Sequence, residues 1–379
     1  MAEKKKIIRA TTIPMSLDIF CRDMLREMSE EYDVVALSSP GEEMAVVAER
    51  EGVRTISVPM ERHISLLKDI KSLFALIKVF RNEKPYAVHS MTPKAGLLCM
   101  IAAWMTKVPV RIHTFTGLVW PTSKGITRAI LKTTDKITCA CATHIIPEGQ
   151  GVMNDLRNGG ITKKPMKVLG YGNVRGIDMQ HYDRTEEVMA EADKIRNDGV
   201  FTFVFVGRIV GDKGINELVS AFKRLHEKYE QTRLLLIGWF ETQLDPVSGE
   251  TRRIIEEMDS VEAVGQQSDV RAWYAASDCF VFPSYREGFP NTVIEAGALG
   301  LPSIVTDING SREIIIEGEN GVIVPVRDAD ALYDAMEMML TDEQKRLTMA
   351  GNSRRLIETR FEKSYVRKCQ LDFYREKLK

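Results

Sequence analysis

Two short segments of the C-terminal half combine charged residues with glycines in a spacing that suits anion binding. The first follows the apolar run FTFVFVG and contains Gly207, Arg208, Gly211, Lys213 and Gly214. Glycines allow a tight turn after a strand, arginine offers a planar fork of donors to phosphate, and lysine offers a point charge. The combination suits a diphosphate, although an ordinary loop with two solvated cations is the alternative.

The second segment reads SYREGFPNTVIEA and follows the apolar run CFVF. Gly288 permits a sharp turn, and Pro290 suits the first turn of a helix, where its missing N–H group is not needed. The N–H groups of Asn291, Thr292 and Val293 are then expected at a helix N-terminus, a position that favours an anionic phosphate.

Two glutamates belong to this segment, with seven residues between them. Glu287 lies in the loop before the expected helix, and Glu295 lies inside the helix. A carboxylate accepts hydrogen bonds from a diol, so both are candidates for binding ligand hydroxyls. The alternatives are a buried carboxylate bonded to backbone for Glu295 and a partner of the helix dipole for Glu287.

Short β-branched runs alternate with longer amphipathic stretches along the chain, which predicts an α/β fold of parallel sheets covered on both faces. Ligands bind at the carboxyl ends of such strands. Strands are expected at 7–12, 32–38, 53–59, 86–91, 110–115, 143–147, 201–207, 233–238, 261–265, 279–284, 302–306 and 321–325. Helices are expected, among others, at 17–30, 66–81, 214–229, 270–276 and 362–379.

The length of 379 residues predicts two domains of ordinary size. A polar stretch at about 174–199 separates the two series of strands. We therefore expect an N-terminal domain at 1–173 and a C-terminal domain at 174–361, with a further helix at 362–379. Two doubly wound domains in tandem predict a ligand site in the cleft between them.

The composition, 44% hydrophobic and 28% charged with a net charge of -1, is that of a soluble globular protein. Basic residues are concentrated in the N-terminal half and acidic residues in the C-terminal half. The six scattered cysteines fit reduced thiols in a cytosolic protein. No signal-peptide core is expected, and the longest apolar run, 96–105, is too short to span a bilayer. The sequence predicts a cytoplasmic protein, with any membrane attachment peripheral.

Together these segments resemble the signature of the family 4 retaining glycosyltransferases of the GT-B fold. The resemblance rests on EGFPNTVIEA, on the upstream GR-x4-KG, and on the intervening VEAVGQQSDVRAWYAASDCFVFPS, and it is strong from about 207 to 319. It implies two Rossmann-like doubly wound domains that face each other across a cleft. The terminal segment FEKSYVRKCQLDFY resembles the helix that crosses back to the first domain in this family.

The resemblance implies a role for each matching residue. Arg208 and Lys213 neutralise the diphosphate of a nucleotide-sugar donor, so that no metal ion or other cofactor is required. Glu295 binds the ribose hydroxyls, and Glu287 contacts the hydroxyls of the transferred sugar. Five further residues are expected to line the sugar and phosphate site: Gly207, Gly288, Phe289, Asn291 and Thr292. Two are expected near the base: Gly265 and Gln266.

In the N-terminal half, the segment 111–117 ends a predicted strand, and His113 in this segment matches a histidine that lines the active site in related bacterial enzymes. The resemblance implies a hydrogen bond to the transferred sugar, and a buried structural histidine is the alternative. The first strand-to-helix loop, 12–18, lacks the Gly-Gly pair that many relatives carry. Ser16 and Asp18 in this loop suit helix caps.

The segment from Arg62 to Lys84 is basic and strongly apolar. One face must pack on the sheet, and the excess of cations also suits docking on an anionic membrane surface. A basic, solvated surface helix is the alternative.

We therefore predict a retaining, metal-independent hexosyltransferase. It would move a hexose or N-acetylhexosamine from a nucleotide sugar, with UDP as the expected nucleotide, to a saccharide or polyprenyl-diphosphate-linked acceptor in capsule, O-antigen or exopolysaccharide synthesis. We expect it in the cytoplasm or peripherally on the cytoplasmic face of the inner membrane, with no nucleic-acid partner.

Three other protein classes fit parts of the pattern. A nucleotide-sugar epimerase of the same fold would need an acid/base pair at the sugar and no acceptor. A non-enzymatic protein that binds lipid or nucleic acid through its basic half would not need two cations and two glutamates at one sheet edge. A nicotinamide oxidoreductase loses its main support because no G-x-G-x-x-G follows the first strand.

Overall fold

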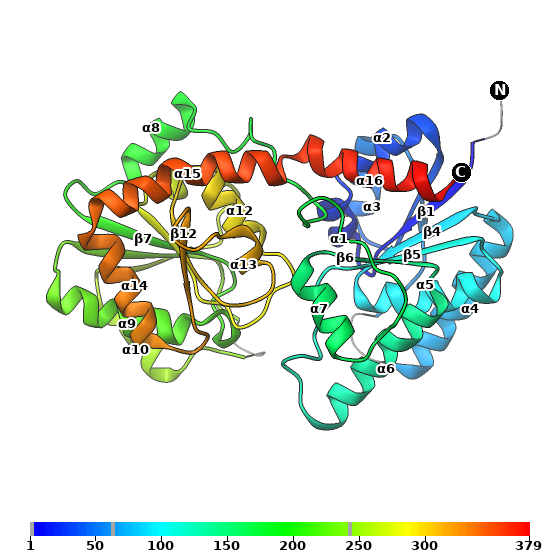
Figure 1. The fold of residues 1–379 in the computed structure, drawn as a ribbon, viewed down its shortest axis with the longest axis horizontal. Coiled ribbons are helices and arrows are strands. Elements are labelled where there is room, and N and C mark those ends of the chain that lie inside the picture. Colours follow the sequence, from blue (N-terminus) through cyan, green and yellow to red (C-terminus); the bar gives the residue numbers. More distant parts are fainter. Residues whose placement is uncertain (1–3, 62–64, 242–244) are drawn as a thin grey trace. The chain divides into compact units, whose positions relative to one another are not determined.

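The computed structural model describes residues 4–61, 65–241 and 245–379. The chain forms two compact units, shown in Figure 1. Unit 1 comprises Met1–Gly176 and Ser364–Lys379, and unit 2 comprises Ile177–Lys363. Each unit contains one six-stranded sheet whose strands all pair in parallel. The predicted fold class, α/β with two Rossmann-like domains, is confirmed.

In unit 1 the strand order is β3-β2-β1-β4-β5-β6. The strands are β1 (Lys6–Ala10), β2 (Asp33–Ser38), β3 (Arg54–Ser57), β4 (Ala87–Met91), β5 (Val110–Phe115) and β6 (His144–Pro147). The helices up to the end of this sheet are α1 (Pro14–Phe20), α2 (Met24–Glu31), α3 (Glu43–Glu51), α4 (Leu66–Glu83), α5 (Pro93–Met105), α6 (Gly125–Cys141) and α7 (Gln150–Asn158). The strand order reverses direction between β1 and β4, which makes this pair the switch point of the sheet.

Helices cover both faces of the unit 1 sheet, as the alternation along β1 shows. Ile7 and Ile8 are fully buried neighbours whose side chains point to opposite faces. Ile8 belongs to a core shared with α4, α5, α6 and α7. Ile7 belongs to a core shared with α1, α2, α3 and the C-terminal helix α16 (Lys363–Lys377).

In unit 2 the strand order is β12-β11-β10-β7-β8-β9, so the switch point lies between β7 and β10. The strands are β7 (Phe201–Val206), β8 (Thr232–Ile237), β9 (Val261–Gly265), β10 (Cys279–Phe282), β11 (Ser303–Thr306) and β12 (Gly321–Val324). The helices are α8 (Glu186–Ile195), α9 (Ile215–Lys228), α10 (Gly249–Glu257), α11 (Arg271–Ala275), α12 (Asn291–Ala298), α13 (Ser311–Ile314), α14 (Ala329–Thr341) and α15 (Glu343–Phe361).

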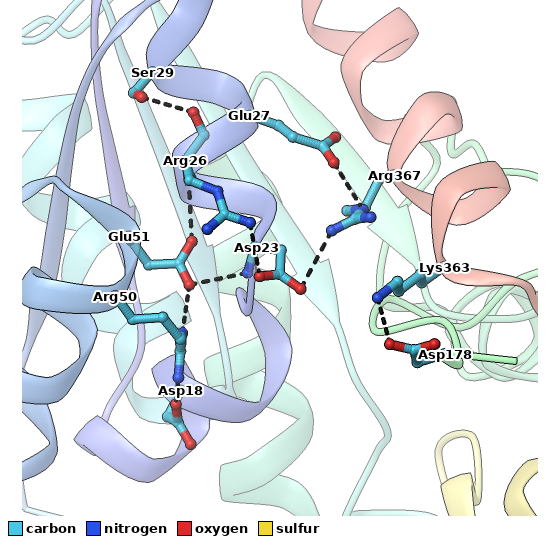
Figure 2. A network of polar contacts seen from close by, with 10 residues as sticks. All are labelled: Asp18, Asp23, Arg26, Glu27, Ser29, Arg50, Glu51, Asp178, Lys363 and Arg367. Atoms are coloured by element: carbon cyan, nitrogen blue, oxygen red, sulfur yellow. Dashed lines mark hydrogen bonds and ion pairs between the residues drawn. The ribbon is translucent and has the colours of Figure 1, made fainter. Parts of the chain in front are cut away.

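The single helix predicted at 17–30 is two helices, α1 and α2. The helical conformation is interrupted at Asp23, whose φ of 61° lies in the left-handed region. The buried carboxylate of Glu51 accepts hydrogen bonds from the N–H groups of Asp23 at 2.9 Å and Arg26 at 3.2 Å (Figure 2). A side chain from α3 therefore accepts hydrogen bonds from N–H groups at the start of α2. The local sequence pattern does not predict this contact.

The predicted terminal helix at 362–379 is α16, which follows α15 after an extended residue, Glu362. Arg367 of α16 forms ion pairs with Asp23 at 3.4 Å and Glu27 at 3.1 Å (Figure 2). Farther along α16, the buried Tyr374 hydroxyl accepts a hydrogen bond from the guanidinium of Arg9 on β1. The predicted return of the C-terminal helix to the first domain is confirmed.

No helix in the described part of the chain combines the length and apolar character needed to cross a bilayer.

Candidate active site

The switch point of the unit 2 sheet brings the two charged segments together. β7 and β10 are parallel neighbours, with Phe203 opposite Cys279, so the loops that follow them leave the same edge of the sheet. The loops touch at Gly214, whose φ is +70° and where a Cβ atom would lie 2.1 Å from the carbonyl oxygen of Pro283. Only glycine allows this approach.

An ion pair joins the two loops. The Lys213 ammonium pairs with Oε1 of Glu287, and the Ser284 hydroxyl donates to the same oxygen at 2.9 Å. The ammonium also lies 5.2 Å from the ring centroid of Phe282. Both charged side chains are largely buried, with exposed fractions of 16% and 18%. The pair is therefore held in one geometry, in a partly desolvated place where charge acts strongly on a ligand.

Arg208 lies two residues after the end of β7 and is half-buried. Among the residues that the structure describes, none forms a hydrogen bond or ion pair with its guanidinium. The nearby Arg286 instead forms an ion pair with Asp212 at 3.1 Å. This second ion pair also connects the loop after β10 with the loop after β7. The switch point thus carries one cation engaged with a carboxylate and one cation available for an anion.

The start of α12 lies at the same edge, one residue later than predicted. Pro290 is the N-cap residue, with an extended backbone (φ -74°, ψ 108°), and Asn291 and Thr292 are the first two helical residues. The predicted place of Pro290 in the first turn is therefore wrong by one position. Pro290 provides no side-chain cap for this helix, and a helix N-terminus has the polarity that favours an anion.

The loop before α12 rests on the loop that follows β11. A Cβ atom on Gly310 would lie 2.6 Å from the carbonyl oxygen of Gly288 and 2.7 Å from Cα of Phe289. The Phe289 side chain is buried against Phe361, with ring centroids 5.4 Å apart. Phe289 therefore supports the loop through its ring, and a contact with a ligand would come from its backbone, as the resemblance implies.

Glu295 is buried in α12, with 8% of its surface exposed. Gly265 ends β9, with a φ of +72°, and its carbonyl accepts the N–H group of Gly238 at 3.0 Å. Gln266, the next residue, is exposed. Since β9 is two strands from β7, Gly265 lies about 10 Å along the same edge from Gly207. The assigned roles of these residues stay predictions.

His113 lies on β5 in unit 1, whereas the other candidate residues lie in unit 2. Its ring is buried against α5, where a Cβ atom on Gly96 would lie 2.3 Å from Cε1. Nδ1 lies 2.9 Å from the Ser90 hydroxyl oxygen. Burial lowers the pKa of His113 to about 3, so the imidazole is neutral at physiological pH. Its role toward the transferred sugar stays a prediction from the resemblance.

The first loop of unit 1 differs from our prediction. α1 begins at Pro14 with Ile13 as the N-cap residue, so Ser16 and Asp18 lie inside the helix and neither caps it. Asp18 instead forms an ion pair with Arg22 at 3.1 Å. It forms a second ion pair with Arg50, which Figure 2 shows. Proline suits the first helical position, which explains why the helix starts earlier than the polar residues indicated.

Two threonines at the unit 1 switch point escaped the sequence analysis. The hydroxyls of Thr12 and Thr92 lie 2.8 Å apart, and the Thr12 N–H group donates to the Thr92 hydroxyl at 3.1 Å. Thr92 has a φ of 69°, a strained conformation for a β-branched residue. The only local signal is a Thr-Pro pair after a strand, which does not distinguish a site from an ordinary helix start.

Comparison with known proteins gives matches over both units. Residues 190–356 match the sequence model for glycosyl transferases group 1, and residues 19–172 match the glycosyl transferase 4-like domain. The chain is 34% identical over 366 residues to the capsular polysaccharide biosynthesis glycosyltransferase CapM of Staphylococcus aureus, covering 96% of this chain and 95% of the relative.

A second relative is the UDP-Gal:alpha-D-GlcNAc-diphosphoundecaprenol alpha-1,3-galactosyltransferase of Escherichia coli, 29% identical over 325 residues, with 82% of this chain and 81% of the relative covered. Among solved structures, Alr3699/HepE of Anabaena in complex with UDP superposes with a TM-score of 0.81 at 16% identity, covering 98% of this chain and 100% of that one. That structural likeness supports the fold.

Proposed function

The chain belongs to the family 4 glycosyltransferases of the GT-B fold, and from this premise we propose that it transfers a hexose or N-acetylhexosamine from a UDP-sugar to a saccharide or polyprenyl-diphosphate-linked acceptor. The pathway we propose is the synthesis of capsule, O-antigen or exopolysaccharide. The relative from Staphylococcus aureus carries a capsule-synthesis name, and the relative from Escherichia coli is named for a UDP-sugar donor and a diphosphoundecaprenol acceptor.

One observation carries the proposal: the unit 2 switch point gathers Arg208, Lys213, Glu287 and the start of α12 at one sheet edge. Two cations and a helix N-terminus suit a diphosphate. A carboxylate fixed beside them suits sugar hydroxyls. A nucleotide sugar is the ligand that needs both.

We propose retention of the anomeric configuration without a metal ion. The bond between the anomeric carbon and the diphosphate oxygen breaks, and UDP leaves with the electron pair. The acceptor hydroxyl forms the new bond on the same face and gives its proton to the departing diphosphate. Arg208, Lys213 and the α12 N-terminus stabilise the charge that develops on that diphosphate. Glu287 orients the sugar through its hydroxyls.

Family membership favours a transferase over the epimerase and over a non-enzymatic binding protein. The relative from Staphylococcus aureus, aligned along nearly the whole chain, is named as a transferase. An epimerase would have no use for an acceptor, and a lipid-binding or nucleic-acid-binding protein would have no use for the ion pair of Lys213 and Glu287 at a sheet edge.

We also propose that unit 1 docks on an anionic membrane surface at the cytoplasmic face of the inner membrane. α5 packs against both α4 and α6, so the three helices form one layer. Large apolar side chains are exposed along this layer: Leu66, Leu67, Ile70 and Phe74 on α4, Trp104 and Met105 on α5, and Ile126, Ile130 and Ile137 on α6. A monomeric soluble protein rarely exposes so many on one face.

Basic residues on the same helices supply charge complementarity to anionic lipid. They are Lys68, Lys71, Lys78 and Arg81 on α4, and Arg128, Lys132 and Lys136 on α6. A cation near such a surface contributes about 1 kcal/mol. Arg62, with which the predicted basic segment begins, lies outside the described residues.

Calorimetric titration in the presence of EDTA tests the donor site. We expect UDP, and neither GDP nor ADP, to bind wild-type protein at micromolar concentration, and Arg208→Ala to weaken that binding at least ~10-fold. The matched control is Arg253→Ala, which removes an exposed arginine from α10 in the same unit. Binding of another nucleotide would correct the base, and equal UDP binding by the Arg208 variant would overturn the assigned diphosphate site.

A further inference from the structure

A cavity of about 500 Å³ opens at the edge of the unit 2 sheet opposite to the donor loops. It is lined by the segments that lead into three strands: 196–200 before β7, 275–278 before β10 and 300–302 before β11. These are the amino ends of the strands. The six residues of β7 separate them from Arg208 by about 20 Å. The cavity is therefore distinct from the donor site.

Three arginines line this cavity: Arg184 before α8, Arg196 after α8 and Arg346 on α15. Each guanidinium donates one hydrogen bond to a backbone carbonyl: Arg184 to Leu299 at 2.9 Å, Arg196 to Ala275 at 3.0 Å and Arg346 to Met339 at 2.9 Å. One nitrogen of each guanidinium is thus held by a backbone carbonyl. The other N–H groups remain in a fixed orientation for a ligand.

The positive charge of the cavity is only partly balanced. Neither Arg184 nor Arg196 forms an ion pair within the described ranges, and the Glu343 carboxylate lies 3.9 Å from Arg346. Asp198 and Asp278 also line the cavity, so three arginines face two carboxylates there, and the Asp278 carboxylate accepts the N–H group of Thr202 at 2.8 Å. Burial, together with repulsion from Arg196 and Arg354, lowers the pKa of Arg184 against the attraction of Asp278. The lining therefore keeps a small excess of positive charge.

The walls of the cavity are suited to a small organic group. Leu301, Pro302, Leu347 and Ala350 line it beside the arginines. The guanidinium of Arg346 lies 4.9 Å from the ring centroid of Phe201, which fixes the planar group over an aromatic face. A ligand with an anionic head and a short carbon part would suit both the guanidinium groups and the apolar walls.

We propose that this cavity binds a phosphomonoester, with the phosphate held by Arg184, Arg196 and Arg346 and the carbon part against Leu301 and Leu347. The small excess of positive charge in the lining favours an anion, and planar guanidinium forks bind phosphate oxygens in pairs. The ligand would occupy unit 2 at the same time as a donor nucleotide, since the two sites lie at opposite edges of the sheet.

Calorimetric titration tests this site in protein that carries Arg208→Ala and Lys213→Ala, so that the donor loops contribute no phosphate binding. The probes are inorganic phosphate and glucose 1-phosphate. We expect both to bind in the millimolar range or tighter, with glucose 1-phosphate tighter. In that background, Arg196→Ala and Arg346→Ala should each weaken binding ~10-fold or more.

Two further variants separate a binding role from a structural one. Asp278→Asn removes a negative charge but keeps an acceptor for Thr202, and it should strengthen phosphate binding several-fold, opposite in sign to the arginine variants. Arg253→Ala on α10 should leave binding unchanged. Equal affinity for the two probes would support a site for free phosphate with the same arginines. No binding of either probe, or unchanged binding in both arginine variants, would overturn the proposal.

Discussion

Lys213 and Glu287 lie 74 positions apart, and their side chains form an ion pair at the switch point of the unit 2 sheet. The parallel pairing of β7 with β10 brings their loops together. The Ser284 hydroxyl donates to the same carboxylate oxygen at 2.9 Å. The contact fixes an ammonium and a carboxylate side by side before any ligand arrives, and in the proposed mechanism this reduces the reorganisation needed during transfer.

Lys213→Ala should lower kcat/KM for sugar transfer by about 10²–10³, because it removes a cation that stabilises the departing diphosphate and leaves Glu287 without its partner. The matched control is Lys223→Ala on α9, whose exposed ammonium pairs with Glu227 at 3.7 Å. Steady-state transfer assays with a UDP-sugar give both values. A variant at position 213 that keeps wild-type kcat/KM would remove this lysine from the mechanism.

Gly214→Ala should destabilise unit 2 by at least about 1–3 kcal/mol and abolish UDP binding, because a Cβ atom there meets the Pro283 carbonyl at 2.1 Å and the φ of +70° is strained for alanine. Gly249→Ala is the control, since a Cβ atom on Gly249 meets nothing within 4 Å. Chemical denaturation and calorimetry provide the two measurements. If both variants behave as wild type, the tight contact between the two loops is not required.

Buried histidines should make unit 1 less stable as the pH falls. Burial lowers the pKa of His113 to about 3, while the unfolded chain titrates near 6.5. A histidine whose pKa is lower in the folded than in the unfolded chain stabilises the folded state fully only above the unfolded pKa. This contribution is lost as the pH falls from 6.5 to 3. Each such histidine contributes about 1.4 kcal/mol per pH unit in this window. Burial and the charge of Arg9 also lower the pKa of His89.

Denaturation between pH 6.5 and 5 isolates this effect from carboxylates such as Glu83, whose pKa is lowered to about 2 by its hydrogen bond to Arg54 and which matter below about pH 4.5. His113→Gln should reduce the pH slope of the unit 1 unfolding free energy by about 1.4 kcal/mol per unit. His181→Gln, which replaces an exposed ring in unit 2, is the control. A slope that the His113 variant leaves unchanged would contradict a neutral, buried imidazole.

Phe74→Glu should weaken binding to vesicles of anionic phospholipid at least ~10-fold, because it places a charge on an exposed apolar face and adds repulsion from the lipid. Phe74 is 65% exposed on α4. Val46→Glu on α3 is the matched control, since Val46 is 54% exposed on a helix that packs on the opposite face of the sheet. Co-sedimentation at low and high salt measures both. Equal loss in the two variants would point to a general charge effect rather than to the α4–α6 layer.

The strands could be predicted from the sequence because their signal is local. β5 and β9 have the predicted bounds, and every other predicted strand overlaps an observed one, since β-branched runs between turn residues carry the pattern within a few positions. The two charged segments were also visible, because glycines, cations and glutamates occur there in a short, specific spacing. Residue type and local spacing were enough to indicate the family, and the diphosphate-binding edge that they also indicate stays a prediction.

Contacts between distant segments required the folded chain. The interruption between α1 and α2 at Asp23 depends on a hydrogen bond to the Glu51 carboxylate of α3. The strained backbone of Thr92 depends on the hydrogen bond that its hydroxyl accepts from Thr12, after the neighbouring strand. The arginines at 184, 196 and 346 are unremarkable in the sequence and meet only because three strands begin at one edge of the sheet. Such sites depend on which strands become neighbours, and that follows from burying both faces of each sheet rather than from any local pattern.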